Sequence, residues 1–420
     1  MLPSSRKIYS SSASISRTTE WISQIVCCIY LMLFVFFDLS YSLIWFLMII
    51  GSCIVRLLFS GRISSIKFSL YIALIYLYLV PTIGLFVDGS GDPLPFLALF
   101  ILAIDVISRG SGVWSPKRIQ KGSSSYFDLC VWCILIVFSC LGGFLIVDSD
   151  KFISLFSFLI PFASSLVFFE RLVRNSRDHE IIIMLTVYFI VIGIYIMLYW
   201  HGFGRLVIGA YLLMPVLIAD HHRDFGLRIW HAIVLAPPLL AVSHLSRYGG
   251  WGGWQDLASG SAAHHLVLTL QLFNSDIHSS YGGFVRFLEQ FSLFFLNWVP
   301  REIWLNKPIG IGLASVDEWF GRAGFPDGFT ISLGMFGEQL YLSGANFFIF
   351  YWFFLIVCIL LTRKLIQRLG KENIAPVVAF DVSIISFVWG GSATFGSRAW
   401  FFVAPMLIAI FLLERGANRK

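Results

Sequence analysis

The sequence predicts an all-α, polytopic integral membrane protein with about 12 transmembrane helices and one large structured loop. Of its 420 residues, 58% are hydrophobic and only 13% are charged, which excludes an ordinary soluble protein. The mean hydropathy is +0.81. The apolar segments are continuous, whereas the strands of a membrane β-barrel alternate apolar and polar residues. A helical span needs about 20 apolar residues, so the chain has room for about a dozen spans.

Apolar segments separated by polar breaks locate these spans. The first twenty residues form a polar tail, and the apolar stretch after it continues through residues 38–40 into a second one. We therefore interpret the first stretch as a span and not as a cleaved signal peptide. The expected spans are 21–37, 40–55, 68–87, 94–108, 126–147, 152–170, 181–200, 206–220, 229–244, 343–362, 374–388 and 399–413.

The distribution of Lys and Arg predicts which loops face the cytoplasm, because cytoplasmic loops of membrane proteins are enriched in these residues. With the N-terminus inside, 22 of the 30 Lys and Arg residues fall in cytoplasmic segments and eight fall on the outer side. Both termini are therefore expected in the cytoplasm. The net charge of +6 reflects these loops, so no nucleic-acid partner is expected.

This topology divides the chain into five parts. They are a cytoplasmic tail (1–20), a nine-span membrane bundle (21–244), a large outer loop with interfacial helices (245–342), three C-terminal spans (343–413) and a second cytoplasmic tail (414–420).

One apolar stretch of the outer loop, Phe284 to Val299, resembles a further span. Arg286 and Glu289 shorten its uninterrupted apolar part to about ten residues, too few to cross a membrane. We expect a helix that lies in the outer interface or packs on the bundle.

Most outward cations are concentrated in the outer loop and the adjoining span ends. Ion pairs within the loop or contacts with lipid headgroups explain any one of them. Together they indicate an anion site, because most are arginines, whose planar guanidinium suits phosphate. The clustered cations are Arg205, Arg247, Arg286, Arg301, Lys307, Arg322 and Arg398.

The most informative stretch of the loop is VPREIWLNKPIGIG, from Val299 to Gly312. Its prolines and glycines exclude a continuous helix and hold Arg301 and Lys307 on a stiff turn. The stretch contains a P-R-x-x-W-x-x-K-P element that resembles one in Wzy-type O-antigen and oligosaccharide repeat-unit polymerases of bacteria. The G-x-G-R of 202–205 and the GEQLYLSG of 337–344 are also similar to this family. The element consists of Pro300, Arg301, Trp304, Lys307 and Pro308.

The resemblance covers the topology of the whole chain, but its motifs amount to about a dozen residues in two outer loops. Some members of the family carry an arginine followed by ten residues and a glycine in each of two outer loops. Arg301 and Gly312 fit this pattern, whereas Arg205 does not, because residue 216 is Val.

The resemblance implies an integral-membrane glycosyltransferase of the GT-C type, at the periplasmic face of the bacterial inner membrane. It would polymerise undecaprenyl-pyrophosphate-linked oligosaccharide repeat units into O-antigen or a related surface polysaccharide. The donor carries the bond energy in its sugar–pyrophosphate linkage, so no cofactor is expected. A flippase, a chain-length regulator and membrane lipids are the implied partners.

Arg301 and Glu338 are the expected catalytic residues. Arg301 would neutralise the charge that develops on the departing pyrophosphate. Glu338 would accept the proton of the acceptor hydroxyl, because partial burial at the mouth of the tenth span would raise its pKa. An ion pair with a loop arginine is the alternative for Glu338. Substrate-binding roles are expected for Arg205, Arg247, Arg286, Trp304, Lys307 and Arg398.

Other polar residues are weaker candidates. The adjacent His264 and His265 cannot share one helix face, and no second pair completes the C-x-x-C at Cys130, so no metal site is expected. Asp105 and Asp381 lie inside apolar spans, where polar contacts between helices explain them better than a functional role. The weaker candidates for the base are His264, His265, Asp317 and Glu318.

Two other functions remain open. An O-antigen ligase would use the same donor and chemistry but would transfer the glycan to lipid A core. A 12-span polysaccharide flippase or other transporter would place charges near the midplane in paired, broken helices and would have short loops. The chain instead has few midplane charges and one large outer loop, which favours the polymerase.

Overall fold

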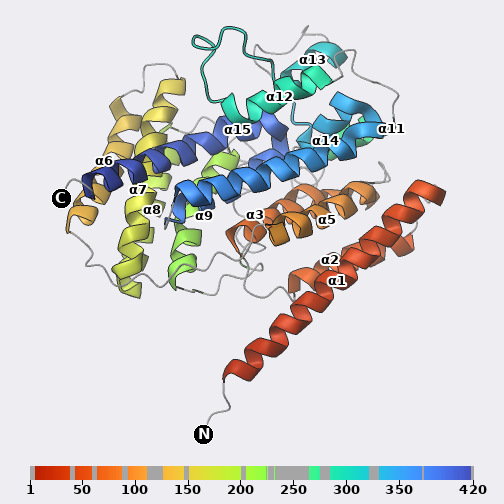
Figure 1. Cartoon of the computed structure of the whole chain (residues 1–420), viewed down its shortest axis with the longest axis horizontal. Coiled ribbons are helices and arrows are strands. Elements are labelled where there is room, and N and C mark those ends of the chain that lie inside the picture. Colours follow the sequence, from red (N-terminus) through yellow and green to blue (C-terminus); the bar gives the residue numbers. More distant parts are fainter. Residues whose placement is uncertain are drawn as a thin grey trace.

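The computed structural model forms a helical bundle in which α14 and α15 run side by side through the middle (Figure 1). Helices α1 and α2 lie at one edge of the bundle, and α6 to α8 lie toward the other. In the part of the chain that the structure describes, every regular element is a helix. The described residues are 5–37, 43–58, 64–87, 93–110, 126–145, 151–199, 205–223, 225, 231, 264–274, 284–320, 331–370 and 373–417.

The N-terminal half contains the helices that carry the first eight expected spans. The third of these spans is one continuous helical segment, because the π-helical turn η1 joins α3 to α4 without a break. The elements are α1 (Ser5–Phe37), α2 (Leu43–Leu58), α3 (Ser65–Ala73), η1 (Leu74–Leu79), α4 (Val80–Val87), α5 (Leu94–Gly110), α6 (Tyr126–Leu145), α7 (Lys151–Asn175), α8 (Asp178–Tyr199) and α9 (Arg205–Arg223).

The C-terminal half contains three short helices followed by the two longest. The described parts of the large loop 245–342 are thus mostly helical, as expected for a structured loop. The elements are α11 (His264–Asn274), α12 (Phe284–Leu296), α13 (Ile311–Phe320), α14 (Gly334–Leu369) and α15 (Ala375–Ala417).

Every expected span within the described residues overlaps a helix, whereas 229–244 lies outside them except for residue 231. Length and hydropathy together single out five segments that are able to cross a membrane. The helical, membrane-embedded character is therefore supported, and the number of twelve spans stays a prediction. The five segments are Thr18–Val35, Ser65–Leu85, Asp178–Tyr195, Phe347–Leu369 and Ala375–Arg415.

The last two expected spans, 374–388 and 399–413, are not joined by a loop. Both lie in α15, which is interrupted only at Gly391 (φ 74°, ψ −164°). This backbone conformation is essentially restricted to glycine. One residue therefore breaks the helix where the hydropathy pattern had suggested a connecting segment. Helix α14 has a similar break at Gly344 (φ 66°, ψ 176°).

Helix α12 confirms that the apolar stretch 284–299 contains a short helix packed on the bundle. It has 13 residues, which is too few for a span. Phe287 stacks on Tyr351 of α14 with ring centroids 4.3 Å apart. Phe294 stacks on Phe395 of α15 at 4.5 Å. These contacts fix α12 against α14 and against the part of α15 that follows the break.

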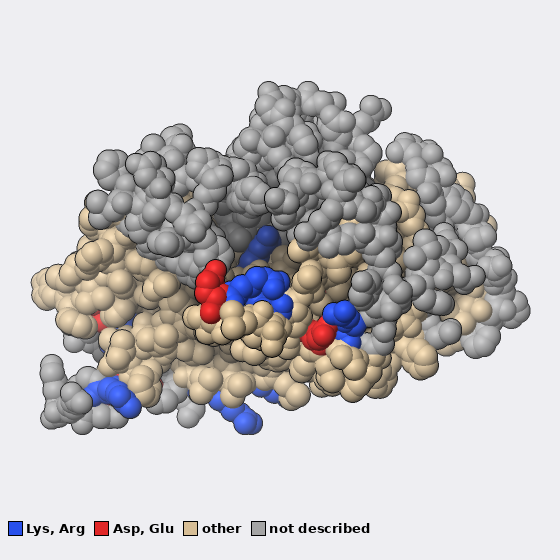
Figure 2. Space-filling model, turned by 90° about the horizontal axis from the view of Figure 1, so that it is seen from above, with Lys and Arg blue, Asp and Glu red and all other residues tan. Residues whose placement is uncertain are grey.

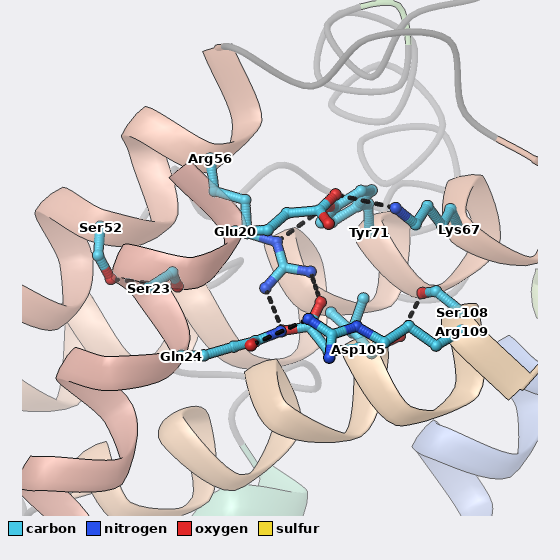
Figure 3. Close-up of polar contacts among 11 residues, drawn as sticks. Glu20, Ser23, Gln24, Ser52, Arg56, Lys67, Tyr71, Asp105, Ser108 and Arg109 are labelled. Carbon is cyan, nitrogen blue, oxygen red and sulfur yellow. Dashed lines mark hydrogen bonds and ion pairs between the residues drawn. The ribbon is translucent and has the colours of Figure 1, made fainter. Parts of the chain in front are cut away.

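A buried polar network joins α1, α2, α3 and α5 (Figure 3). Arg56, which is 1% exposed, forms an ion pair with Asp105. Its Nε donates to the Tyr71 hydroxyl at 2.8 Å. Gln24 Nε2 also donates to Asp105, at 2.7 Å. The expectation that Asp105 makes polar contacts between helices is confirmed.

Asp381 of α15 makes similar contacts. Its carboxylate accepts hydrogen bonds from Arg363 Nε of α14 at 2.7 Å and from Ser65 Oγ of α3 at 2.6 Å. Both members of this ion pair are buried. Asp381 therefore ties three helices together, as the sequence had suggested.

We expect Asp381→Asn to lower the free energy of unfolding by about 3–5 kcal/mol, because it leaves the Arg363 charge buried without its partner. Thermal or denaturant unfolding of the detergent-solubilised protein measures this loss. Replacing both residues, Arg363→Met with Asp381→Leu, should recover most of it. Equal stability of the wild type and Asp381→Asn would contradict the assignment.

The N-terminus of α15 is held by Glu170 of α7. The buried carboxylate accepts hydrogen bonds from the backbone N–H groups of Ile374 and Ala375, both at 2.8 Å, and contacts His222 Nε2 at 3.1 Å. A carboxylate in this position satisfies free N–H groups and complements the helix dipole. Glu170 therefore joins α7 to α9 and to the start of α15.

We expect alkaline phosphatase fused after Gly260 to be active and the same enzyme fused after Lys371 to be inactive. The 22-to-8 partition of Lys and Arg places the first position outside and the second inside. Phosphatase activity, normalised to fusion abundance, decides the orientation. The opposite pattern would overturn the map.

Candidate functional site

The candidate site is centred on the break in α15. Glu338 of α14 lies beside this break, and its Oε2 accepts a hydrogen bond from Ser392 N at 2.6 Å. Ser392 begins the second half of α15, residues 392–417. The first N–H groups of a helix lack partners within the helix, so the glutamate satisfies one of them at the positive end.

Gly391 is needed for this arrangement in two ways. Its positive φ places the backbone in a conformation that other residues rarely adopt. A Cβ atom at this position would also overlap Glu338 Oε2. The break and the position of the glutamate therefore depend on the same residue.

We expect Gly391→Ala to lower the thermal stability of the protein, because it strains the break and displaces the Glu338 carboxylate. Thermal unfolding of the detergent-solubilised protein measures the effect. Gly51→Ala is the matched control, since nothing lies within 4 Å of its added Cβ. An unchanged unfolding temperature for Gly391→Ala would contradict the assigned position of Glu338.

Glu338 is more buried than the sequence suggested, with only 4% of its surface exposed. This burial raises the pKa of Glu338 to about 7, although the hydrogen bond from Ser392 acts in the opposite direction. Its second oxygen, Oε1, has no hydrogen-bond partner among the described residues. No described arginine forms an ion pair with Glu338. The alternative hypothesis, that Glu338 pairs with a loop arginine, therefore finds no support among the described residues.

Further buried polar groups line the same region. Gln339 is fully buried, and its amide has no hydrogen-bond partner among the described residues. The ring of His265 in α11 packs against Trp389, which lies two residues before the break, with centroids 5.4 Å apart. Sequence reasoning had named His265 but missed Gln339, Trp389 and Ser392. Only the glycine at 391 could have drawn attention to them.

The turn after α12 is braced by its two cations. Arg301 donates from Nη1 to the Lys307 carbonyl at 2.9 Å and from Nη2 to the Pro308 carbonyl at 3.2 Å. Lys307 Nζ donates to the carbonyl oxygens of Asn297 and Val299. The turn is thus rigid, as the prolines predict. Two of the five guanidinium N–H groups of Arg301 are engaged, which leaves three for an anion.

Lys307 is influenced by a neighbouring cation and a neighbouring carboxylate. Partial burial and the charge of Arg301 lower the pKa of Lys307, whereas Glu302 acts in the opposite direction. An anion bound between Arg301 and Lys307 would relieve the repulsion between these two cations. Trp304, the aromatic residue of the same turn, is half-buried. Figure 2 looks onto the face that carries α12 and shows basic and acidic side chains next to each other near its centre.

The turn contacts Ala393 of α15, two residues after the break at Gly391. Asn297 Nδ2 donates to the Ala393 carbonyl at 2.6 Å, and Gly310 lies close to the Ala393 side chain. Ala393 follows Ser392, the residue that holds Glu338. The structure thus brings the Arg301 turn and Glu338 to one segment of α15, although they are far apart in sequence.

Two other residues that were expected to bind the substrate, Arg398 and Arg286, lie outside this turn. Arg398 lies in α15 beyond the break, and its Nη1 is 3.5 Å from Ser386 Oγ, so the short segment across Gly391 carries both a carboxylate contact and a cation. Arg286 forms an ion pair with Glu289 one turn along α12, at 2.6 Å. The ion-pair alternative therefore accounts for Arg286.

The remaining candidates cannot be placed. Arg205 begins α9, but its side chain lies outside the described residues, as do the side chains of His264, Asp317 and Glu318 and all of Arg247 and Arg322. Among the residues that the structure describes, no group of three or more His, Cys, Asp and Glu side chains is suited to hold a metal ion.

Comparison with known proteins adds no family assignment: no protein-family model, no curated protein and no solved structure matches the chain.

Proposed function

We propose that the protein is a glycosyltransferase that polymerises undecaprenyl-pyrophosphate-linked oligosaccharide repeat units at the periplasmic face of the bacterial inner membrane. The product is O-antigen or a related surface polysaccharide. One observation carries the proposal. Glu338, a buried carboxylate with a pKa near 7 and one unbonded oxygen, lies at a helix break to which a rigid, doubly basic turn is also attached.

The reaction needs both components of this site. The acceptor hydroxyl oxygen attacks the anomeric carbon of the donor sugar, the bond from that carbon to the pyrophosphate oxygen breaks, and the hydroxyl proton passes to Glu338. A base with a pKa near 7 is ionised for part of the time at neutral pH and can still bind the proton. The leaving pyrophosphate takes the bonding electron pair, and its added charge requires cations. Arg301 is the main residue proposed to bind the pyrophosphate and neutralise this charge.

Secondary roles follow from position and chemistry. Lys307 and Arg398 are the proposed additional anion ligands, and Trp304 offers a ring on which a sugar can stack. The resemblance of the 300–308 turn to the Wzy-type element supports this distribution of roles. Arg205 and Arg247 remain proposed ligands on the basis of the sequence alone.

Transport is the second candidate function, because α14 and α15 are both broken and lie against each other. Paired broken helices are typical of secondary transporters, where they lie near the membrane midplane. Here Gly344 precedes the apolar segment Phe347–Leu369. Gly391 falls between the expected spans 374–388 and 399–413, which together form the single apolar segment Ala375–Arg415. With the twelve spans that the sequence predicts, both breaks fall at the ends of spans, which favours surface chemistry over transport.

Deletion of the gene, followed by analysis of the lipopolysaccharide ladder, tests the proposal. We expect long chains to disappear while a single repeat unit remains on the core. Loss of every repeat unit would instead indicate a ligase or a flippase. Purified protein in liposomes with the lipid-linked repeat unit as sole substrate should form polymer without any nucleotide, which separates polymerisation from transport.

A further inference from the structure

An apolar groove runs along the outside of the bundle between α6, α7 and the second half of α15. Its volume is about 1120 Å³. Small residues form part of its lining, namely Ser164 on α7 and Ala404 and Ala409 on α15, and larger apolar side chains form the rest. The rim residues Ile160 and Ile408 are 47% and 59% exposed, so the groove is open along its side.

The groove extends between the two sides of the membrane that the topology assigns. At one end lies Trp298, from the outer loop, together with Trp400. At the other lie Arg171 and Asp128, which form an ion pair at 3.5 Å. Arg171 belongs to a segment expected in the cytoplasm. Trp400 and Leu413 both line the groove and are thirteen residues apart on α15, so it is about 20 Å long.

This length argues against an ordinary phospholipid as the specific ligand. One leaflet contributes about 15 Å of hydrocarbon, half of the roughly 30 Å bilayer core. A phospholipid tail would therefore fill only the outer part of the groove, whereas a long prenyl chain can fill all of it.

The outer end of the groove adjoins the basic turn. Trp298 lies between Asn297 and Val299, whose carbonyl oxygens accept hydrogen bonds from Lys307 Nζ. A lipid chain that leaves the groove past Trp298 meets the turn that carries Lys307 and Arg301. The apolar groove and the two cations together match a lipid with a long tail and a phosphate-bearing headgroup.

From this juxtaposition we infer that the groove holds the prenyl chain of a lipid carrier whose phosphate groups bind at Arg301 and Lys307. The inference rests on the proposed function for the identity of the carrier. It adds which helices bind the lipid and where the headgroup enters.

Photo-crosslinking in native membranes tests the inference. We expect a benzophenone amino acid at position 404 to capture a prenyl lipid, identified by mass spectrometry. The same probe at position 137 should capture phospholipid only, because Val137 is an exposed residue of α6 that does not line the groove. Arg301→Ala should reduce prenyl capture at 404 about tenfold or more, as expected when hydrogen bonds between charged groups are removed. Phospholipid alone at both positions would overturn the inference.

A second experiment uses product formation. Ala404→Trp should block the groove and shorten the polymer, whereas Val137→Trp should leave it unchanged at equal protein abundance. Normal polymer from Ala404→Trp would overturn the inference even if the polymerase function holds. Prenyl capture at 404 in a protein that forms no polymer would support the groove while refuting the proposed function, so the two failures are distinguishable.

Discussion

Glu338→Gln should abolish chain extension, with a loss of about 10²–10⁴ in rate, the usual contribution of a general base. The substitution preserves the size of the side chain and leaves an amide oxygen able to accept the hydrogen bond from Ser392. Only the proton acceptor is removed. The rate of polymer formation by purified protein in liposomes, with the ladder of chain lengths in cells, measures the effect.

The pH dependence of the wild type gives an independent check. Glu338 must be ionised to act as a base, so activity should rise as the pH increases through about 7 and level off above it. Stability should change in the opposite direction. Burial raises the pKa of Glu338 above its ordinary value of 4.5, so its contribution is greatest below that value and is lost as the pH rises through about 7.

The matched control is Glu289→Gln, which alters a half-buried glutamate of α12 that pairs with Arg286. Removing this pair should change stability by about 1 kcal/mol or less and leave activity intact. Glu338→Gln should also be at least as stable as the wild type above neutral pH. An active Glu338→Gln variant would refute the assignment of the base.

Arg301→Ala and Arg301→Lys should both reduce the rate by about 10²–10³, the typical effect of losing a positioned donor that stabilises developing charge. Lysine keeps the charge but lacks the planar fork that binds phosphate at two points. In the structure this fork also braces the turn through the carbonyl oxygens of Lys307 and Pro308. Long chains should therefore collapse to one or a few repeat units with either variant.

An Arg301 substitution removes the hydrogen bonds that hold the turn and also removes a ligand for the anion. These two effects need to be distinguished. Asn306→Ala changes an exposed residue of the same turn and should leave the product unchanged. Binding of inorganic pyrophosphate to the purified protein provides a direct readout. It should weaken with both Arg301 variants and not with Asn306→Ala. Full-length polymer from Arg301→Ala would exclude the proposed role of Arg301 in binding the pyrophosphate.

The sequence by itself determined the membrane class and most helix positions, and it predicts the side of the membrane on which each loop lies. These features depend on local composition. A run of apolar residues forms a helix in a membrane because its backbone has no other source of hydrogen bonds. The short helix α12 and the stiffness of the turn at Pro300 and Pro308 were predictable for the same local reasons. The choice of Glu338 depended on one motif and on its position near a span.

Only the tertiary structure decided how these parts combine. The break at Gly391 and the burial of Glu338 depend on the packing of α14 against α15, which no local pattern encodes. Packing also paired Asp105 and Asp381 with arginines and joined the Arg301 turn to Ala393. The groove beside α15 arises where small residues of separate helices meet. Contacts between residues distant in sequence set these features, because burial and the pKa of a carboxylate depend on what surrounds it in space.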